Sequence, residues 1–320
     1  MCQPEYLSMK IHHIHQPSDI LSIADGVVVA LGFFDGVHLA HQDLIRTTIQ
    51  TAHDHDKTSG IVTFYPKPSF VLQPSQEESY LTPLEVKARI CEGLGIEHLF
   101  VIEFSTAVAQ LSPRAFVQQY LMPLGVCLVV AGDDNRYGAK GAGSIRSIAE
   151  DSDGTIQGIE FQEQALDGTR ISASLIREHL REGRVAMART FLGRAYRIDG
   201  RVVYGKGRGK LIGIPTANIA LRYPYLIPKG GVYAVKLLWQ GKAYDGVCNI
   251  GYNPTFGANN RQTVEVHVLN FSSALYDEYV EVEFYDRIRD ETVFAGPEAL
   301  VAQIRRDIEV ATAVFSALQS

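Results

Sequence analysis

The chain has 320 residues, of which 46% are hydrophobic and 21% charged, and its net charge is −6. Chains longer than about 250 to 300 residues usually divide their hydrophobic core, so we expect two domains. The composition is that of a folded globular protein and excludes a low-complexity or disordered chain. The negative net charge argues against nucleic acid as a partner.

The N-terminal segment lacks the apolar core of a signal peptide, and the longest apolar run, near residues 126–131, is far too short to cross a bilayer. The four cysteines are dispersed and form no CxxC pair of the kind found in zinc sites or redox couples: Cys2, Cys91, Cys127 and Cys248. We therefore expect a cytoplasmic protein with ordinary thiols, no membrane association and no obligate protein partner.

Charge and pattern both change near residue 185. Residues 1–185 hold 14 Lys and Arg against 23 Asp and Glu, a balance of −9, whereas residues 186–320 hold 16 against 13, a balance of +3. Before this point apolar runs alternate with helical stretches, and after it come period-2 strands separated by Gly and Pro. We predict one domain over residues 1–185 and a second over residues 186–320.

The first half alternates strands with helices. Near its start, His12, His13 and His15 could bind a metal, but a mobile N-terminal segment is the simpler interpretation. Buried strands and intervening helices are then predicted over residues 27–31, 61–64, 84–94, 98–102, 114–120 and 126–130. Such alternation predicts a doubly wound, Rossmann-like parallel sheet, and ligands in these sheets bind beyond the carboxyl ends of the strands.

The turn after the first of these strands places His38 and His41 three positions apart at a helix start. Exposed backbone N–H groups and the helix dipole favour an anion there, and two imidazole donors would stabilise charge growing on a transferred phosphoryl group. The pattern indicates nucleotidyl transfer. A pair of surface histidines or a metal site is the alternative, although the HxxH pair lacks the third ligand that zinc requires.

Residues 32–41 resemble the GxFDGVHxGH signature of the nucleotidyltransferase module in bacterial riboflavin kinase/FAD synthetases. The resemblance implies that His38 and His41 bind the phosphates of ATP. It also places four further residues of the turn in the nucleotide site: Gly32, Phe34, Asp35 and Gly36.

A second signature of that superfamily, IS[ST]TxIR, is similar to residues 171–177. The resemblance implies that Arg177 neutralises phosphate charge and that Ser172 and Ser174 donate hydrogen bonds. On its own, the stretch is more typical of an N-cap followed by an amphipathic helix.

The first half departs from the family pattern at three places. Ala40 replaces the Gly between the histidines, and residues 64–68 lose the acid and the histidine of an FDPHP-like stretch, with Lys67 near its end. The flavin-side loop, GxDFxFG in the family, keeps Asp134 as a candidate site residue but has Asn135 where an aromatic residue is usual. These departures leave open an alternative in which the first half binds nucleotide or flavin without turnover and the chain is a kinase only.

In the second half, a strand over residues 195–204 leads into a basic glycine-rich loop. Its backbone and cations suit a phosphate, although the spacing is neither that of a Walker loop nor that of a Rossmann fingerprint. A flexible hairpin tip is the alternative. The loop residues predicted to contact phosphate are Gly205, Lys206, Gly207, Arg208, Gly209 and Lys210.

Oxygen-bearing side chains follow this loop. Thr216 and Asn218 are two residues apart in an extended segment, so both project to one side and offer ligands that suit Mg²⁺. Glu265 and His267 share one face of a predicted strand. Glu265 could take the proton from a hydroxyl that attacks the γ-phosphate of ATP, the alternative being a solvated surface carboxylate.

Residues 190–300 closely resemble the riboflavin kinase domain through its GxPTAN motif, its GGVY strand start at residue 230, the segment over residues 249–256 and the ExH strand. The resemblance implies that Pro215, Thr216 and Asn218 bind Mg-ATP and that Glu265 is the catalytic base for the ribityl 5′-hydroxyl. It further implies that the glycine-rich loop closes over the phosphates and that Arg287 and Arg289 border the flavin.

The fold implied for this half is a small antiparallel β-barrel closed against a C-terminal helix that begins at Gly296-Pro297. The whole chain is thus predicted to be α/β plus all-β. We expect it to phosphorylate riboflavin to FMN and to adenylylate FMN to FAD, with ATP, riboflavin and FMN as substrates and Mg²⁺ as cofactor.

Overall fold

The computed structural model describes residues 9–73, 79–162, 165–205, 209, 213–252 and 262–318. The chain divides into two compact units, Met1–Ser172 and Ala173–Ser320. Helices α7 (Ala173–Arg181) and α8 (Val185–Leu192) are grouped with the second unit, because α8 packs on its strands. The predicted limit at residue 185 coincides with the start of α8 and stays a prediction for the functional domains.

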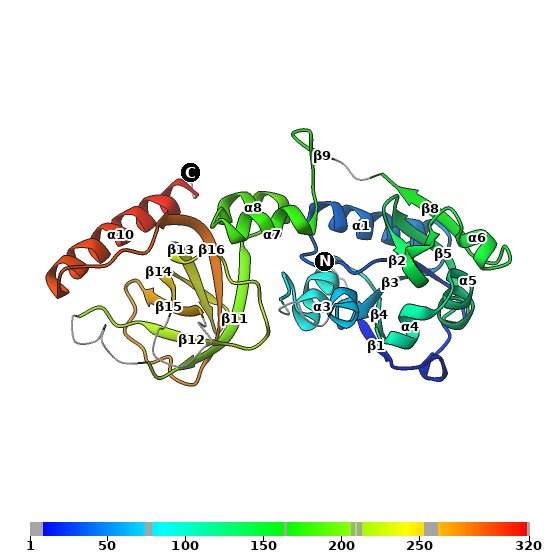
Figure 1. Ribbon diagram of the computed structural model, residues 1–320, viewed down its shortest axis with the longest axis horizontal. Coiled ribbons are helices and arrows are strands. Elements are labelled where there is room, and N and C mark those ends of the chain that lie inside the picture. The colour runs from blue at the N-terminus through cyan, green and yellow to red at the C-terminus, as the bar shows by residue number, and fades with distance from the viewer. Residues whose placement is uncertain are drawn as a thin grey trace, which may run out of the picture. The chain divides into compact units, whose positions relative to one another are not determined.

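A six-stranded parallel sheet forms the centre of the first unit (Figure 1). Neighbouring strands pair in parallel throughout, as predicted. Long apolar runs suit these strands because helices cover both faces. In spatial order the strands are β1 (Lys10–Ile14), β4 (His98–Glu103), β3 (Thr58–Tyr65), β2 (Val27–Leu31), β5 (Val126–Gly132) and β8 (Gln157–Phe161).

Alternate residues of β2 face two separate cores. Val28 and Ala30 join the cluster that includes residues of α1 (Leu39–Asp54) and α3 (Leu84–Gly93). Val27 and Val29 join the cluster on the opposite face, which includes residues of α4 (Thr106–Gln110) and α5 (Pro113–Phe116). The sheet is therefore doubly wound, as the sequence predicts.

The order of the strands fixes where a ligand can bind. From β2 the chain adds β3 and β4 on one side and then returns to add β5 on the other. The turn after β2 and the loop after β5 consequently lie at the point where the winding reverses, beyond the carboxyl ends of the strands. This is the usual ligand site of an open parallel sheet.

The expectation of a mobile segment around His12 is wrong. His12 and His13 lie in β1, which pairs in parallel with β4 at the sheet edge. His12 Nε2 is 2.9 Å from His98 Nδ1, and the two rings stack. The strand is short and polar, so periodicity in the sequence does not reveal it.

The second unit is a closed antiparallel barrel. Its strands, in order around the barrel, are β11 (Tyr196–Val203), β12 (Ala217–Leu221), β15 (Gln262–Val268), β14 (Lys242–Tyr252), β13 (Gly231–Trp239) and β16 (Tyr279–Arg289). Helix α10 (Pro297–Ala317), capped by Gly296, lies on the outside of the barrel (Figure 1). Ala311 and Phe315 of this helix pack on Val232, Ala234 and Val247. Both the barrel and the helix start are confirmed.

Short elements complete the description. They are η1 (Pro17–Asp19), α2 (Pro68–Leu72), η2 (Val117–Leu121), β6 (Arg136–Tyr137), η3 (Ala139–Gly141), β7 (Gly143–Ser144), α6 (Ile148–Asp151), β9 (Ala165–Leu166) and β10 (Thr169–Arg170). Within the residues that the structure describes, no helix is both long and apolar enough to serve as a membrane span. Cys91, Cys127 and Cys248 carry free thiols.

Candidate active sites

The turn after β2 has an unusual backbone. Phe34 and Val37 adopt positive φ angles of 54° and 41°, and Gly36 one of 86°. Positive φ is costly for residues with a side chain, and for β-branched Val37 above all, so neighbouring contacts must hold this conformation. Its effect is to bring His38 to the N-cap of α1 and to start that helix at the carboxyl edge of the sheet.

His38 and His41 form a stacked pair at this helix start. Their ring centroids are 3.6 Å apart, the rings are inclined by 16°, and His38 Nδ1 accepts a hydrogen bond from the backbone N–H of His41 at 3.3 Å. Burial, and then the neighbouring His38 and Lys87, hold the pKa of His41 well below its ordinary value. His41 Nδ1 is buried and makes no hydrogen bond to any residue that the structure describes. The pair thus offers a neutral, pre-positioned imidazole.

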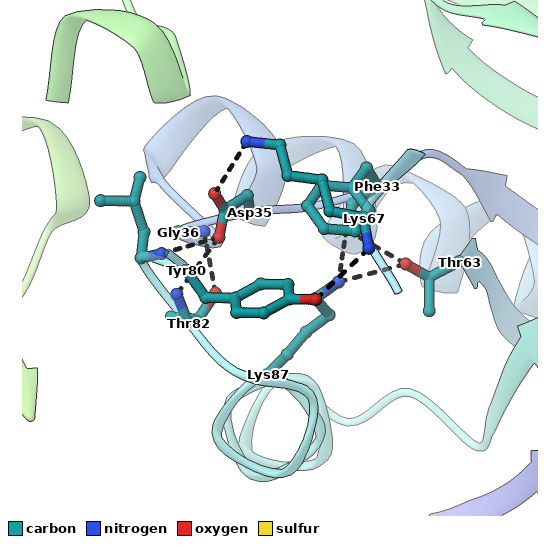
Figure 2. A network of polar contacts seen from close by, with 9 residues as sticks. Phe33, Asp35, Gly36, Thr63, Lys67, Tyr80, Thr82 and Lys87 are labelled. Carbon is teal, nitrogen blue, oxygen red and sulfur yellow. Dashed lines mark hydrogen bonds and ion pairs between the residues drawn. The ribbon is translucent and has the colours of Figure 1, made fainter. Parts of the chain in front are cut away.

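Asp35 anchors the turn to the segment before α3 (Figure 2). Its Oδ1 accepts hydrogen bonds from the backbone N–H groups of Leu81 and Thr82, at 3.0 and 3.2 Å. The N–H of Gly36 in turn donates to Thr82 Oγ1 at 2.8 Å. These contacts hold the strained turn in place.

Lys67, which departs from the family pattern, lies beside Asp35. Its Nζ is 4.0 Å from Asp35 Oδ2 and 5.8 Å from the ring centre of Phe33 (Figure 2). The structure therefore puts a cation next to the turn predicted to bind phosphate, at the position where the family has histidine.

A cavity of about 630 Å³ opens at the carboxyl ends of the central strands. Residues from the ends of β2, β3, β4 and β5 contribute to its wall, and an aromatic slot of this kind suits a planar ring system. The aromatic residues that line it are Phe33, Phe64, Phe104, Phe116 and Tyr137.

The loop after β5 forms a polar part of the same wall. Asn135, which replaces an aromatic residue of the family, donates from Nδ2 to the carbonyl of Leu31 at 2.8 Å and so ties this loop to β2. Asp134 also lines the cavity and pairs with Arg170 Nη2 at 2.5 Å. Of the nucleotide-site residues predicted for the turn, Gly32 lines the cavity, whereas Phe34 is buried in the core against the edge of the His41 ring.

The second predicted signature lies at the start of α7. Ser172 directly precedes the helix, and Ser174 and Arg177 lie on it, with Arg177 buried. Their roles toward a nucleotide stay predictions.

In the barrel, the strand register places Asn218, Glu265 and Asn249 in one row. Asn218 of β12 is opposite Glu265 of β15, which is opposite Asn249 of β14. Val264 and Val266 are buried inside the barrel, so Glu265 lies on the outer face between them. Thr216 Oγ1 is 3.5 Å from Glu265 Oε2 and extends the row to four oxygen-bearing side chains.

Both described glycines of the basic loop adjoin this row. A Cβ on Gly205 would lie 2.2 Å from Asn218 Nδ2, and one on Gly209 would lie 3.5 Å from Thr216 Oγ1. The predicted contacts of Lys206, Gly207, Arg208 and Lys210 fall outside the described residues. Pro215 holds His267 beside the row, because its carbonyl is 2.8 Å from His267 Nδ1.

The two arginines predicted to border the flavin make different contacts. Nε and Nη2 of Arg289 donate hydrogen bonds to the two carboxylate oxygens of Asp307 on α10, and Asp307 is almost fully buried. Arg287 Nη2 donates to the carbonyl of Gly230 at 2.8 Å and to Asp290 Oδ1 at 2.7 Å. Arg287 and Arg289 therefore link β16 to the start of β13 and to α10, and their contact with a flavin stays a prediction.

Sequence reasoning missed several residues of these sites. Asn249 was placed in a family segment without a role, yet it faces Glu265. Lys87 was not singled out, although a lysine among the buried residues of an amphipathic helix is a visible anomaly. Phe33, Phe64 and Phe104 come from the ends of separate strands and Phe116 comes from α5, so only the fold shows that they meet.

The fold and the two candidate sites define a class of protein, in which a nucleotidyltransferase-type parallel sheet is followed by a kinase-type barrel. Family models agree, because the model described as FAD synthetase matches residues 21–175 and the model described as Riboflavin kinase matches residues 192–315. The chain belongs to the family of bifunctional riboflavin kinase/FMN adenylyltransferases, which confirms the resemblance inferred from its motifs.

Relatives of that description match nearly the whole chain. Those from Bacillus subtilis and Listeria monocytogenes are both 40% identical, over 97% of this chain and 100% of their own length. A relative from Escherichia coli is 33% identical over 93% of this chain and 94% of its own. A crystal structure described as a macrolide-efflux protein from Streptococcus pneumoniae has a TM-score of 0.87 at 30% identity, covering 94% of this chain and 98% of that one. That description concerns the other protein; the similarity here is one of fold.

Proposed function

We propose that this chain makes FMN from riboflavin in its barrel and FAD from FMN in its N-terminal unit, using ATP in both reactions. The observation that carries the proposal is the pairing of two complete constellations in one chain. One is the row of Asn218, Glu265 and Asn249 on the barrel, and the other is the stacked His38–His41 pair beside an aromatic cavity. Membership of the bifunctional family supports both.

In the kinase reaction, Glu265 takes the proton from the 5′-hydroxyl of riboflavin as that oxygen attacks the γ-phosphorus of ATP. The bond from the γ-phosphorus to the bridging oxygen breaks, and ADP leaves. Glu265 has a neighbouring hydroxyl at Thr216 and faces an amide on each flanking strand, which orients its carboxylate. Arg287 and Arg289 border the flavin, and the glycine-rich loop covers the phosphates.

The donor set of this row fits Mg²⁺. Hydroxyl, amide and carboxylate oxygens are ligands that a hard cation prefers, and a magnesium ion in such a site also binds substrate phosphates. Thr216 and Asn218 would hold the ion, which would neutralise charge on the ATP phosphates. The close approach of Gly205 to Asn218 brings the loop backbone to the same place.

In the adenylyl transfer, a phosphate oxygen of FMN attacks the α-phosphorus of ATP and pyrophosphate leaves. His38 and His41 bind the ATP phosphates at the N-terminus of α1, where backbone N–H groups also favour an anion. Ser172, Ser174 and Arg177 add hydrogen bonds and charge. The isoalloxazine ring of FMN occupies the aromatic cavity, and Asp134 contributes to its rim.

Incubation of the purified protein with riboflavin, ATP and magnesium, in parallel with FMN, ATP and magnesium, tests the proposal by chromatography of the flavins. FMN followed by FAD is the expected result. FMN without FAD would make the chain a kinase with a binding module, and no FMN would overturn the proposal. We place both reactions in the cytoplasm, in keeping with the free thiols of Cys91, Cys127 and Cys248.

A further inference from the structure

Lys87 is an anomaly in the packing of the first unit. It lies in α3 between Val86 and Ala88, all three buried, and its side chain is only 2% exposed. Packing alone would favour an apolar side chain here, since burial of an ammonium group costs free energy unless its hydrogen bonds are satisfied. The hydrogen bonds of the buried ammonium group must therefore offset this cost.

The ammonium group of Lys87 points at Phe33 and at Thr63, which itself contacts Phe33 (Figure 2). Nζ donates to the carbonyl of Phe33 at 2.5 Å and lies 4.3 Å from the centre of its ring. It also donates to Thr63 Oγ1 at 3.2 Å, and that hydroxyl donates to the same Phe33 carbonyl at 3.1 Å. Both oxygens that accept hydrogen bonds from Lys87 are neutral, and one is the Phe33 carbonyl while the other donates to it, so these bonds hold Phe33 in place.

Phe33 joins the two parts of the adenylyl-transfer site. Phe33 lines the aromatic cavity, and its backbone leads directly into the strained turn at Phe34 that ends at His38. Lys87 contacts both the ring and the carbonyl of Phe33. A shift of this one residue would therefore change the cavity wall and the position of the histidines together.

We infer that Lys87 is a positioning residue for adenylyl transfer, which holds the flavin cavity and the phosphate-binding turn in register through Phe33. The inference rests on the proposed function of the N-terminal unit. Lys87 acts through Phe33 rather than on the reacting atoms. Misplacement of bound reactants by about 1 Å can cost on the order of 100-fold in rate.

The charges around Lys87 make its contacts with Phe33 sensitive to pH. Burial is the main cause that lowers the pKa of Lys87 to about 8; Lys67 lowers it as well, whereas Asp35 and Cys91 raise it. Lys87 in turn helps to depress the pKa of His41. As pH rises through about 8, Lys87 loses the positive charge that attracts the ring and strengthens its hydrogen bonds, so adenylyl transfer should fall over this range.

The test compares Lys87→Met with Lys10→Met, a matched control because Lys10 is an exposed lysine of β1 in the same unit. For Lys87→Met we expect FMN-to-FAD turnover to fall about 10- to 100-fold, FMN formation from riboflavin to stay at the wild-type rate, and the decline above pH 8 to disappear. The melting temperature should stay equal or rise, since a buried charge is removed while the Thr63 hydroxyl still donates to Phe33. Lys10→Met should match wild type in both activities and in the pH profile of FAD formation.

Thr63→Val, which removes the second donor to Phe33 with little change of shape, should lower FAD formation in the same way but less. FAD formation within twofold of wild type in Lys87→Met, or an unchanged pH profile, would overturn the inference. A drop in melting temperature that accounts for the lost activity, with Thr63→Val unaffected, would reduce Lys87 to a structural role. Failure of the proposed function is a separate result, because wild type itself would then make no FAD from FMN. In that case flavin fluorescence would still test the effect of Lys87 on the cavity, by comparing FMN binding by wild type and by Lys87→Met.

Discussion

At the scale of single residues, electrostatic environment decides which histidines carry charge. His41 is buried beside His38 and Lys87, which lowers its pKa, whereas the hydrogen bond with Glu103 raises the pKa of exposed His15. A neutral His41 can donate one hydrogen bond to a phosphate without adding the cost of a second buried cation.

Proton NMR of the imidazole signals checks this assignment. We expect the His41 signal to show no titration between pH 6 and 8, while His15 in the same spectra titrates above the ordinary value of 6.5. A midpoint for His41 at or above 6.5 would contradict the assignment. Since His41 binds its proton less readily when folded, it contributes stability above pH 6.5 that is lost as pH falls toward its folded pKa.

Gly205 shows how close backbone approach serves the kinase site. Any side chain there would collide with Asn218, whose amide must keep its place beside Glu265. Gly205→Ala should lower FMN formation by about tenfold or more and leave FMN adenylylation intact, because the displaced amide no longer positions the substrate. Gly296→Ala is the matched control, since nothing lies within 4 Å of that position. Equal effects of the two substitutions on FMN formation would contradict the role given to Gly205.

At the scale of secondary structure elements, the edge strand β1 depends on neutral histidines. Burial is the main cause that lowers the pKa of both His12 and His98; Lys10 adds to it for both, and His12 adds further for His98. The unfolded chain therefore binds protons at these residues more readily than the folded protein. Stability is present above pH 6.5 and should decline as pH falls below it.

Thermal unfolding of wild type and His12→Phe between pH 8 and pH 5 measures this effect. The phenylalanine can still stack on Phe100, as His12 does with ring centres 4.8 Å apart, but cannot be protonated. We expect the melting temperature of the variant to fall less than that of wild type over this range. Equal falls would show that the His12–His98 pair does not contribute.

Helix α10 is attached to the barrel by charge as well as by apolar packing. Asp307 is buried and receives hydrogen bonds from Arg289 and from Gln303. Asp307→Ala leaves the Arg289 guanidinium without its carboxylate, and we expect the free energy of unfolding to drop by about 3 kcal/mol. Urea denaturation measures it, with exposed Glu309→Ala on the same helix as the control. A drop no larger than that of the control would mean that apolar packing alone holds the helix.

At the scale of the whole molecule, the sequence predicted both the parallel sheet and the barrel with its C-terminal helix, because each has a strong local signal. The strand Val27–Leu31 is an unbroken apolar run, and Gly296-Pro297 marks the start of α10. What the sequence does not contain is the lateral order of strands. The edge strand β1 was therefore missed, and so was the row formed by Asn249 with Glu265. Lys87 was missed because its function depends on a contact with Phe33, 54 residues earlier.

The central claim is that one chain carries two independent active sites. It is tested most directly by chromatography of the flavin products of Glu265→Gln and His38→Ala, each started from riboflavin and from FMN. Because loss of a general base costs about 100- to 10,000-fold, Glu265→Gln should make almost no FMN from riboflavin yet convert FMN to FAD at the wild-type rate. His38→Ala should make FMN at the wild-type rate and little or no FAD. Loss of FAD formation from FMN in folded Glu265→Gln, or of FMN formation from riboflavin in folded His38→Ala, would contradict the claim.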